Sequence, residues 1–171
     1  MKQSLFFIAI LIGLWYSRKY GQEAVVKINK YFANKKDKPT TPIFMLNKVH
    51  HIAIICSDYQ VSKKFYVEIL GLEIIQEVYR EERQSFKLDL ALNGNYIVEL
   101  FSFPNPPKRV SNPEALGLRH LAFEVDNIES VINHLAQYNI IAEPIRVDEF
   151  SGKRFTFISD PDELPIEFYE R

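Results

Sequence analysis

An internal repeat restricts the folds that this chain can adopt. The segment HIAIICSDYQ, which begins at His51, aligns without gaps with HLAFEVDNIE, which begins at His120, 69 positions later. The segments IVELF and PIEFY lie 68 positions apart, and each carries a central glutamate, Glu99 or Glu167. The chain therefore contains two copies of one unit, with a histidine in the first strand and a glutamate in the last.

Each copy is predicted to form a β-α-β-β-β module, and the fold class is α+β. In the first module, Asp58 caps a helix that Gly71 ends, and Asn127 takes the capping position in the second module. We expect the helices to reach about residues 70 and 138. The strands are predicted near residues 49–56, 72–80, 84–92 and 95–103, and then near 141–148, 153–159 and 164–170. The modules cover about residues 47–104 and 116–171, joined by a proline-bearing loop.

Strand alternation separates two faces in each module. His51, Glu99, His120 and Glu167 lie one position out of step with the apolar residues of their strands. The apolar set should pack beneath the helices: Ile52, Ile54, Val98, Leu100, Leu121, Phe123, Ile166 and Phe168. A curved mixed sheet made of both modules would bring the four polar residues together. Two glutamates are costly to bury there unless a cation meets them.

These four side chains suit a divalent metal ion. Two neutral imidazoles and two carboxylates form a mixed nitrogen and oxygen donor set of formal charge −2. Six-coordinate geometry would leave two positions for water or substrate, as in catalytic metal sites. The alternative is that the histidines are core residues and the glutamates are edge charges. The repeat argues against this alternative, because the same pair occurs twice at matching positions.

The segments that carry the repeat also resemble a known family. They are VHHIAIICSDYQVSKKFYVEILGLE, GNYIVELF, GLRHLAFEV and FISDPDELPIEFYE. Residues 47–171 resemble the vicinal oxygen chelate superfamily, also called the glyoxalase/bleomycin resistance/dioxygenase superfamily. Within it, they look most like short bacterial glyoxalase-like proteins of the YaeR type. Family glyoxalases use a His, Glu, His, Glu metal set, which falls here on His51, Glu99, His120 and Glu167.

The resemblance implies a metal-dependent lyase or isomerase of the glyoxalase type, in the class of lactoylglutathione lyase. Two vicinal oxygens of a small substrate, such as a thiol conjugate, would chelate one ion of Ni, Co, Zn, Mn or Fe. The ion would stabilise an enediolate, and a glutamate would move the proton. By analogy Glu167 is the base and Glu99 is its pseudo-symmetric partner. The family commonly forms homodimers, with the site in one chain or shared between two.

Other residues are candidates for substrate contacts. Glu124 shares the face of His120, and Phe101 and Tyr169 are expected to line the pocket. Arg154 belongs to a set of basic side chains that could meet an anionic substrate. His50 has the opposite parity to His51 and is expected on the helix side or at the rim.

Two other functions stay open. An extradiol-type dioxygenase prefers two histidines and one carboxylate, so Glu99 would be an unwanted fourth ligand. A non-catalytic protein that binds a small molecule or an antibiotic is the third interpretation, although relatives of that kind lack the metal set. Lysine and arginine total 21 against 22 acids, and there is no basic-aromatic stripe, so nucleic acid is not an expected partner. Cys56 is the single cysteine, which excludes an internal disulfide.

The charge balance changes near Met45. Residues 1–44 carry eight basic and two acidic side chains, and the rest of the chain carries 13 and 20. The apolar run LFFIAILIGLWY begins at Leu5 and ends at Tyr16. As a helix it would extend about 18 Å, less than a hydrocarbon core of about 30 Å. Two interpretations stay open: an interfacial anchor followed by a basic linker, which predicts membrane contact, or an extension upstream of a start at Met45, which predicts a cytoplasmic protein.

Overall fold

The computed structural model describes Lys30 and residues 46–171, and Lys48–Arg171 form one compact unit. The apolar run from Leu5 and the basic linker lie outside the described residues, so the boundary near Met45 and membrane contact stay predictions. In the described part of the chain, no helix is long and apolar enough to span a bilayer.

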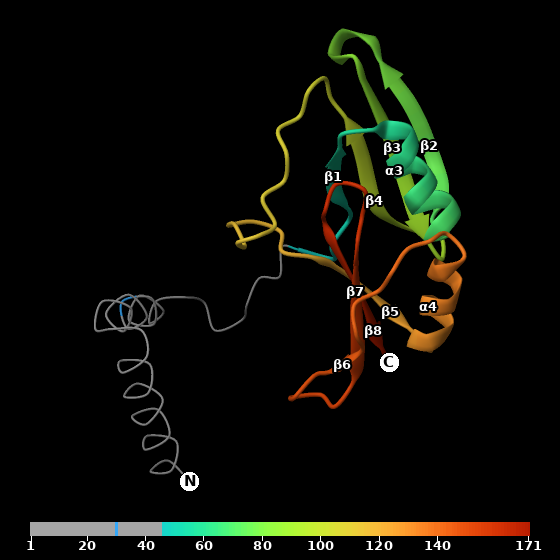
Figure 1. Cartoon of the computed structure of the whole chain (residues 1–171). Coiled ribbons are helices and arrows are strands. Elements are labelled where there is room, and N and C mark those ends of the chain that lie inside the picture. The colour runs from blue at the N-terminus through green and yellow to red at the C-terminus, as the bar shows by residue number, and fades with distance from the viewer. Residues whose placement is uncertain (1–29, 31–45) are drawn as a thin grey trace. The chain divides into compact units, whose positions relative to one another are not determined.

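Both modules have the predicted β-α-β-β-β order (Figure 1). The first contains β1 (Ile52–Cys56), α3 (Tyr59–Lys64), the π-helical segment η1 (Phe65–Ile69), β2 (Glu73–Arg80), the 3-10 turn η2 (Glu81–Arg83), β3 (Ser85–Leu92) and β4 (Asn95–Ser102). The second contains β5 (Leu121–Val125), α4 (Ile128–Ala136), β6 (Arg146–Val147), β7 (Arg154–Ser159) and β8 (Pro165–Glu170).

The predicted helix caps are confirmed. The Asp58 carboxylate accepts a hydrogen bond from the Val61 amide at 3.1 Å, and the Asn127 side chain accepts one from the Ser130 amide at 2.7 Å. The helix in the first module becomes π-helical in its second half and ends at Gly71, whose φ of +76° suits glycine. Each helix starts directly after the first strand, so it packs back on the sheet of its own module.

The strands form two four-stranded sheets of the same topology, with the orders β1-β4-β3-β2 and β5-β8-β7-β6. In each sheet the first and last strands of the module run parallel, and the other neighbours are antiparallel. The register places Ala53 opposite Glu99 and Ala122 opposite Glu167. His51 and His120 are two residues before these alanines and therefore share the face of the glutamates.

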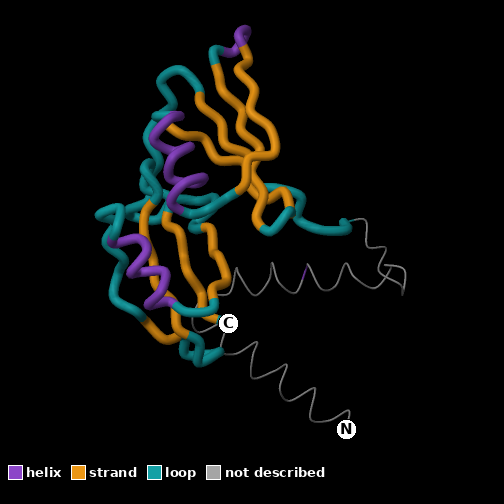
Figure 2. The backbone as a smooth tube through the Cα atoms, turned by 90° about the vertical axis from the view of Figure 1, so that its right-hand side faces the viewer, coloured by secondary structure: helices purple, strands orange, loops and turns teal. Residues whose placement is uncertain are grey.

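The opposite faces of the two sheets contribute to one apolar core. Both helices lie on the same side of the strands (Figure 2). Seven of the eight residues predicted for this layer are buried, and Ile52 packs against them while partly exposed. The core cluster includes side chains from both modules, such as Leu100 and Ile166. The predicted division into an apolar and a polar face is thus confirmed.

Hydrogen bonds join the modules around this core. The Tyr66 hydroxyl donates to Asp160 at 2.8 Å, and both side chains are buried. The Ser57 amide donates to Asp162 at 3.0 Å, and the His134 ring lies 2.8 Å from the Ile69 carbonyl. Contacts on several elements therefore hold the two modules together.

The strand predicted near residues 141–148 is wrong over most of its length, because only Arg146–Val147 form β6. Pro144 has no amide hydrogen for a strand ladder, and Ile141 is 91% exposed. One pair of bonds remains at Glu143, whose amide donates to the Phe157 carbonyl at 2.8 Å and whose carbonyl accepts from Thr156. The second sheet therefore has a shorter outer strand than the first.

The contact between Tyr66 and Asp160 should contribute strongly to stability. In Tyr66→Phe the ring remains, but a buried carboxylate oxygen loses its donor, which should lower the free energy of unfolding by about 1–3 kcal/mol. Urea denaturation followed by circular dichroism measures this change. Tyr79→Phe, at a side chain that is 48% exposed, is the control and should change stability by less than about 0.5 kcal/mol. Equal midpoints for the two variants would contradict the prediction.

Asp160 should also make stability depend on pH. Burial raises the pKa of Asp160 above its usual value of 3.8, and the Leu164 and Tyr66 hydrogen bonds only partly oppose this. As pH rises from 3.8 through the raised pKa, the unfolded chain loses the proton before the folded one, so this group's contribution to stability falls. Asp160→Asn should gain stability relative to wild type across this window in urea titrations. The exposed Asp126→Asn is the control, and a pH-independent gap for Asp160→Asn would refute the assignment.

Candidate metal centre

His51 and Glu99 form the first of two donor pairs, called half-site 1. Nε2 of His51 lies 3.2 Å from Oε2 of Glu99. Nδ1 of His51 lies 2.8 Å from Nδ1 of His50. In the tautomer that leaves Nε2 free for a metal, Nδ1 of His51 carries the proton and donates it to His50. His50, expected on the helix side or at the rim, thus lies directly beside the predicted ligand.

A charged network surrounds half-site 1. Nζ of Lys87 lies 2.9 Å from Oε1 of Glu99 and 2.5 Å from Oδ1 of Asp89. The Tyr96 hydroxyl donates to the same Asp89 oxygen at 2.9 Å, and its ring stacks on His51 with centroids 5.0 Å apart. Burial opposes the charge of Lys87, but the hydrogen bonds to Asp89 and Glu99 outweigh it and raise the pKa of Lys87. Half-site 1 is therefore held by a continuous set of polar contacts.

His120 and Glu167 form half-site 2, which has the same geometry in different surroundings. Nε2 of His120 lies 3.1 Å from Oε2 of Glu167. The Phe157 ring meets the edge of the imidazole with centroids 5.4 Å apart. Nδ1 of His120 is buried and has no hydrogen-bond partner among the described residues. Half-site 2 therefore has an aromatic ring against its imidazole and lacks the lysine and aspartate that contact half-site 1.

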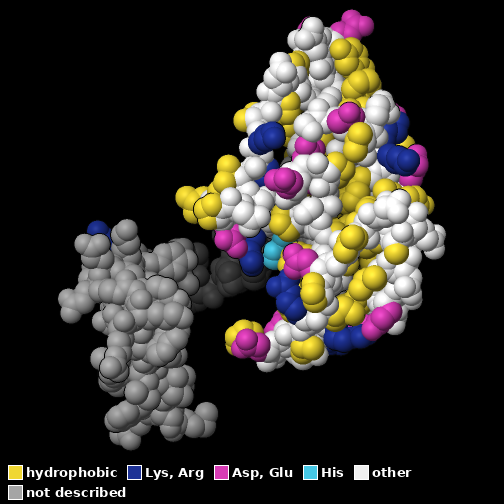
Figure 3. Space-filling model, viewed as in Figure 1, with side chains coloured by type: hydrophobic (Ala, Val, Ile, Leu, Met, Phe, Trp, Pro, Cys, Tyr) yellow, Lys and Arg dark blue, Asp and Glu magenta, His cyan; other side chains and the backbone are white. Residues whose placement is uncertain are grey.

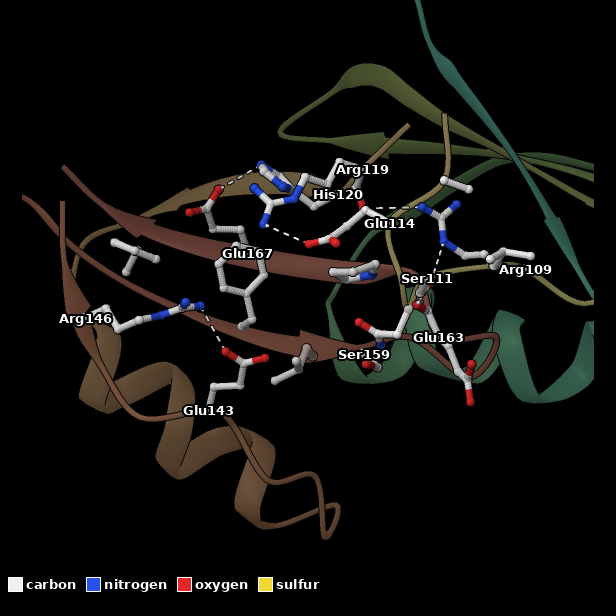
Figure 4. Close-up of a pocket in the computed structure, with 17 residues that line it drawn as sticks. Arg109, Ser111, Glu114, Arg119, His120, Glu143, Arg146, Ser159, Glu163 and Glu167 are labelled. Atoms are coloured by element: carbon white, nitrogen blue, oxygen red, sulfur yellow. Dashed lines mark hydrogen bonds and ion pairs between the residues drawn. The ribbon is translucent and has the colours of Figure 1, made fainter. Parts of the chain in front are cut away.

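An open cavity of about 610 Å³ adjoins half-site 2 (Figure 4). His120, Glu167 and Phe157 line it together with three guanidinium groups, from Arg109, Arg119 and Arg146. Figure 3 shows histidine among lysine or arginine and acidic side chains on this face.

The guanidinium groups already have partners in the chain. Arg146 pairs with Glu143 at 2.9 Å and lies over the Phe155 ring, 4.9 Å from its centroid. The pair of Arg119 and Glu114 is longer, at 3.7 Å, and both side chains are well exposed, so this contact contributes little. Arg119 is thus the arginine most easily turned toward an anionic small molecule.

In each pair, the distance between the histidine nitrogen and the glutamate oxygen fits two ligands on one metal ion. Two donors that bind one ion at right angles, each about 2.1 Å away, lie about 3.0 Å apart. The observed distances of 3.2 and 3.1 Å between Nε2 and Oε2 agree with this value. Within Lys30 and residues 46–171, no three histidine, cysteine or acidic side chains are arranged to hold a metal ion. The single chain presents two separate pairs, and the joining of all four residues at one ion stays a prediction.

The structure places the predicted substrate-contact residues outside the cavity beside His120. Arg154 is paired with Glu129 at 2.5 Å and with Glu170 at 2.6 Å. The Tyr169 hydroxyl donates to Asp148 at 2.9 Å. Phe101 packs under the guanidinium of Arg80, and Glu124 lines a separate cavity of about 420 Å³. Their roles in substrate binding stay predictions.

Lys87, Asp89 and Tyr96 were not identified from the sequence. A signal was present, because Lys87 and Asp89 alternate with buried leucines in β3 and therefore face the same side as Glu99. The repeat drew attention to residues that match between the modules. These three residues have no polar counterpart in the second module, so a comparison of the two copies cannot identify them.

Comparisons with known proteins agree with this architecture. The family model of the Glyoxalase/Bleomycin resistance protein/Dioxygenase superfamily matches residues 48–168. YwkD of Bacillus subtilis (strain 168) is 60% identical over 127 residues, which cover 74% of this chain and 99% of YwkD. YaeR of Escherichia coli (strain K12) is 61% identical over 126 residues, 74% of this chain and 98% of YaeR.

Solved structures and more distant relatives extend the comparison. The glyoxalase family protein from Enterococcus faecalis is 50% identical, covers 74% of this chain and all of its own, and superposes with a TM-score of 0.69. The lactoylglutathione lyase of Schizosaccharomyces pombe is 29% identical over 140 residues, 70% of this chain and 46% of the lyase. The human mitochondrial methylmalonyl-CoA epimerase is 27% identical over 135 residues, 74% of each chain. The neighbours thus include enzymes of more than one reaction.

Proposed function

The chain belongs to the glyoxalase/bleomycin resistance protein/dioxygenase superfamily, and from this premise we propose that it is a metal-dependent lyase or isomerase of the glyoxalase type. The observation that carries the proposal is the pair of His-Glu contacts at 3.2 and 3.1 Å, at matching positions of the two modules. Four such donors suit one divalent ion with two positions open for a small substrate.

Different residues have different roles in the proposed reaction. A divalent ion held by His51, Glu99, His120 and Glu167 would act as a Lewis acid toward two vicinal oxygens of the substrate. Glu167 accepts the proton from the carbon next to a substrate carbonyl and returns it to the neighbouring carbon. The arginines and aromatic rings of the cavity beside His120 bind the rest of the substrate.

We further propose that two copies of the chain share each site. Half-site 1 and half-site 2 each supply only two donors, and all four histidines of the sequence lie in the described residues. In a symmetric dimer, half-site 1 of one copy can face half-site 2 of the other, which produces two equivalent four-ligand sites. A monomeric protein that binds one ion tightly would contradict the shared site.

Mixing two defective variants tests the shared site. His51→Ala damages only half-site 1, and His120→Ala damages only half-site 2. After the two variants are unfolded together and refolded, each mixed dimer has one site with both lesions and one intact site. Because half of the dimers are mixed, metal content and activity should recover to about one quarter of wild type. Elemental analysis and turnover measure the recovery. Sites built within one chain would show none.

The role of Glu167 is tested by Glu167→Gln. The amide keeps the size of the side chain and one oxygen donor, but it cannot accept the substrate proton. We expect more than about half of the bound metal to remain and turnover to fall at least about 100-fold. Metal analysis and the rate of conversion of a methylglyoxal–thiol adduct provide the two measurements. Glu82→Gln, at an exposed glutamate outside the cavity, is the matched control. Full activity in Glu167→Gln would refute the role as base.

A further inference from the structure

The two glutamates of the donor set have different neighbours, although their modules repeat each other. Asp89 lies opposite Glu99 in the sheet, and Phe157 lies opposite Glu167. Lys87 lies opposite Phe101, and Phe155 occupies the matching position opposite Tyr169. Charged residues on β3 are therefore replaced by aromatic residues on β7. The repeat preserves the ligands and changes what holds them.

Glu99 is fixed at both of its carboxylate oxygens. Oε1 accepts from Lys87 at 2.9 Å, and Oε2 lies 3.2 Å from His51. Lys87 is itself bound to Asp89, which also accepts from Tyr96, and Tyr96 stacks on His51. The contacts thus lead from Glu99 through Lys87, Asp89 and Tyr96 back to His51. Rotation of Glu99 would break the ion pair with Lys87.

Glu167 has a single ion-pair partner among the described residues, which is His120 at 3.1 Å. Phe155 and Phe157 supply no charge that could hold its other oxygen, and Arg146 lies over these rings, paired with Glu143. The side chain is 13% exposed, as is that of Glu99, so burial does not distinguish the two carboxylates. The two carboxylates differ because Lys87 binds Glu99, whereas no lysine among the described residues binds Glu167.

We propose that Lys87 is a positioning residue that keeps Glu99 on the metal and thereby leaves Glu167 as the carboxylate that moves. This inference rests on the proposed function, because it concerns the same metal site. A carboxylate with one oxygen tied to a fixed ammonium presents only the other oxygen to an ion. A carboxylate without that restraint can leave the ion and accept a proton. The lysine therefore assigns different roles to two chemically identical ligands.

The direction of the effect on metal affinity distinguishes positioning from simple charge. Loss of a nearby cation would by itself tighten the binding of a divalent ion, because repulsion between like charges is removed. Loss of a group that orients a ligand weakens metal binding, typically about 10–100-fold. Lys87→Met removes the charge and keeps most of the side-chain length. A weaker affinity in this variant therefore reports lost positioning.

The experiment measures the dissociation constant of Co²⁺, added alone, by calorimetry and by the visible spectrum of the bound ion. We expect Lys87→Met to raise this constant about 10–100-fold and to alter the spectrum, and Lys87→Arg to restore most of the affinity. The effect should fall below about threefold in a Glu99→Gln background and persist in a Glu167→Gln background, because Lys87 contacts Glu99 and not Glu167. Lys63→Met is the matched control, since Lys63 pairs with Glu77 at a similar exposure.

The possible outcomes distinguish a failure of this inference from a failure of the proposed function. If the wild-type protein binds no divalent ion, the proposed function fails and the inference fails with it. If the wild type binds Co²⁺ and Lys87→Met binds it equally or more tightly, the inference is overturned and the function stands. An equal loss in the Glu99→Gln background also overturns it. Lys87→Gln is a second variant should Lys87→Met fold poorly, as judged by circular dichroism.

Discussion

The parallel pairing of the first and last strands in each module is the constraint on which the rest of the structure depends. Parallel neighbours need a long connection, and the helix with the two inner strands provides it. The register then sets Ala53 opposite Glu99 and Ala122 opposite Glu167, next to the histidines. Each histidine lies two residues before the alanine and contacts the glutamate of the neighbouring strand. One parallel ladder in each sheet thus determines one donor pair.

The same two ladders also explain why the opposite face of each sheet can be polar. Residues that alternate with the predicted ligands point to the helices and are buried, among them Val98, Leu100, Ile166 and Phe168. The hydrophobic stabilisation comes from that side, and the bond from Tyr66 to Asp160 ties the modules together there. The ligand side contributes little to the core, and its residues can differ between the modules without loss of the fold.

Much of this organisation could be predicted from the sequence, because it follows from short-range rules. The capping residues Asp58 and Asn127, the apolar face and the βαβββ order depend on local patterns, and all are confirmed. Family membership followed from segments that resemble the superfamily. The prediction of a strand near residues 141–148 is wrong because the apolar residues there indicate a strand whose hydrogen-bond ladder Pro144 interrupts. The missing amide hydrogen of Pro144 outweighs the apolar pattern of its neighbours.

The candidate site was predictable only as far as the repeat reached. His51, Glu99, His120 and Glu167 stand at matching positions, and each pair is in contact. Whether the pairs meet depends on contacts between modules or between chains, which no local pattern encodes. The repeat does not indicate a role for Lys87, because the matching residue in the second module is Phe155. A comparison of two copies finds what they share, and it misses the residues by which they differ.

The difference between Lys87 and Phe155 bears on how a substrate would be oriented in the proposed site. If the two halves of that site were equivalent, a two-oxygen substrate would have two poses of equal energy, related by rotation. An ammonium on one side and a phenyl ring on the other would give these poses unequal energies. Divergence at a few flanking positions would thus be enough to select one orientation of a substrate in a duplicated scaffold.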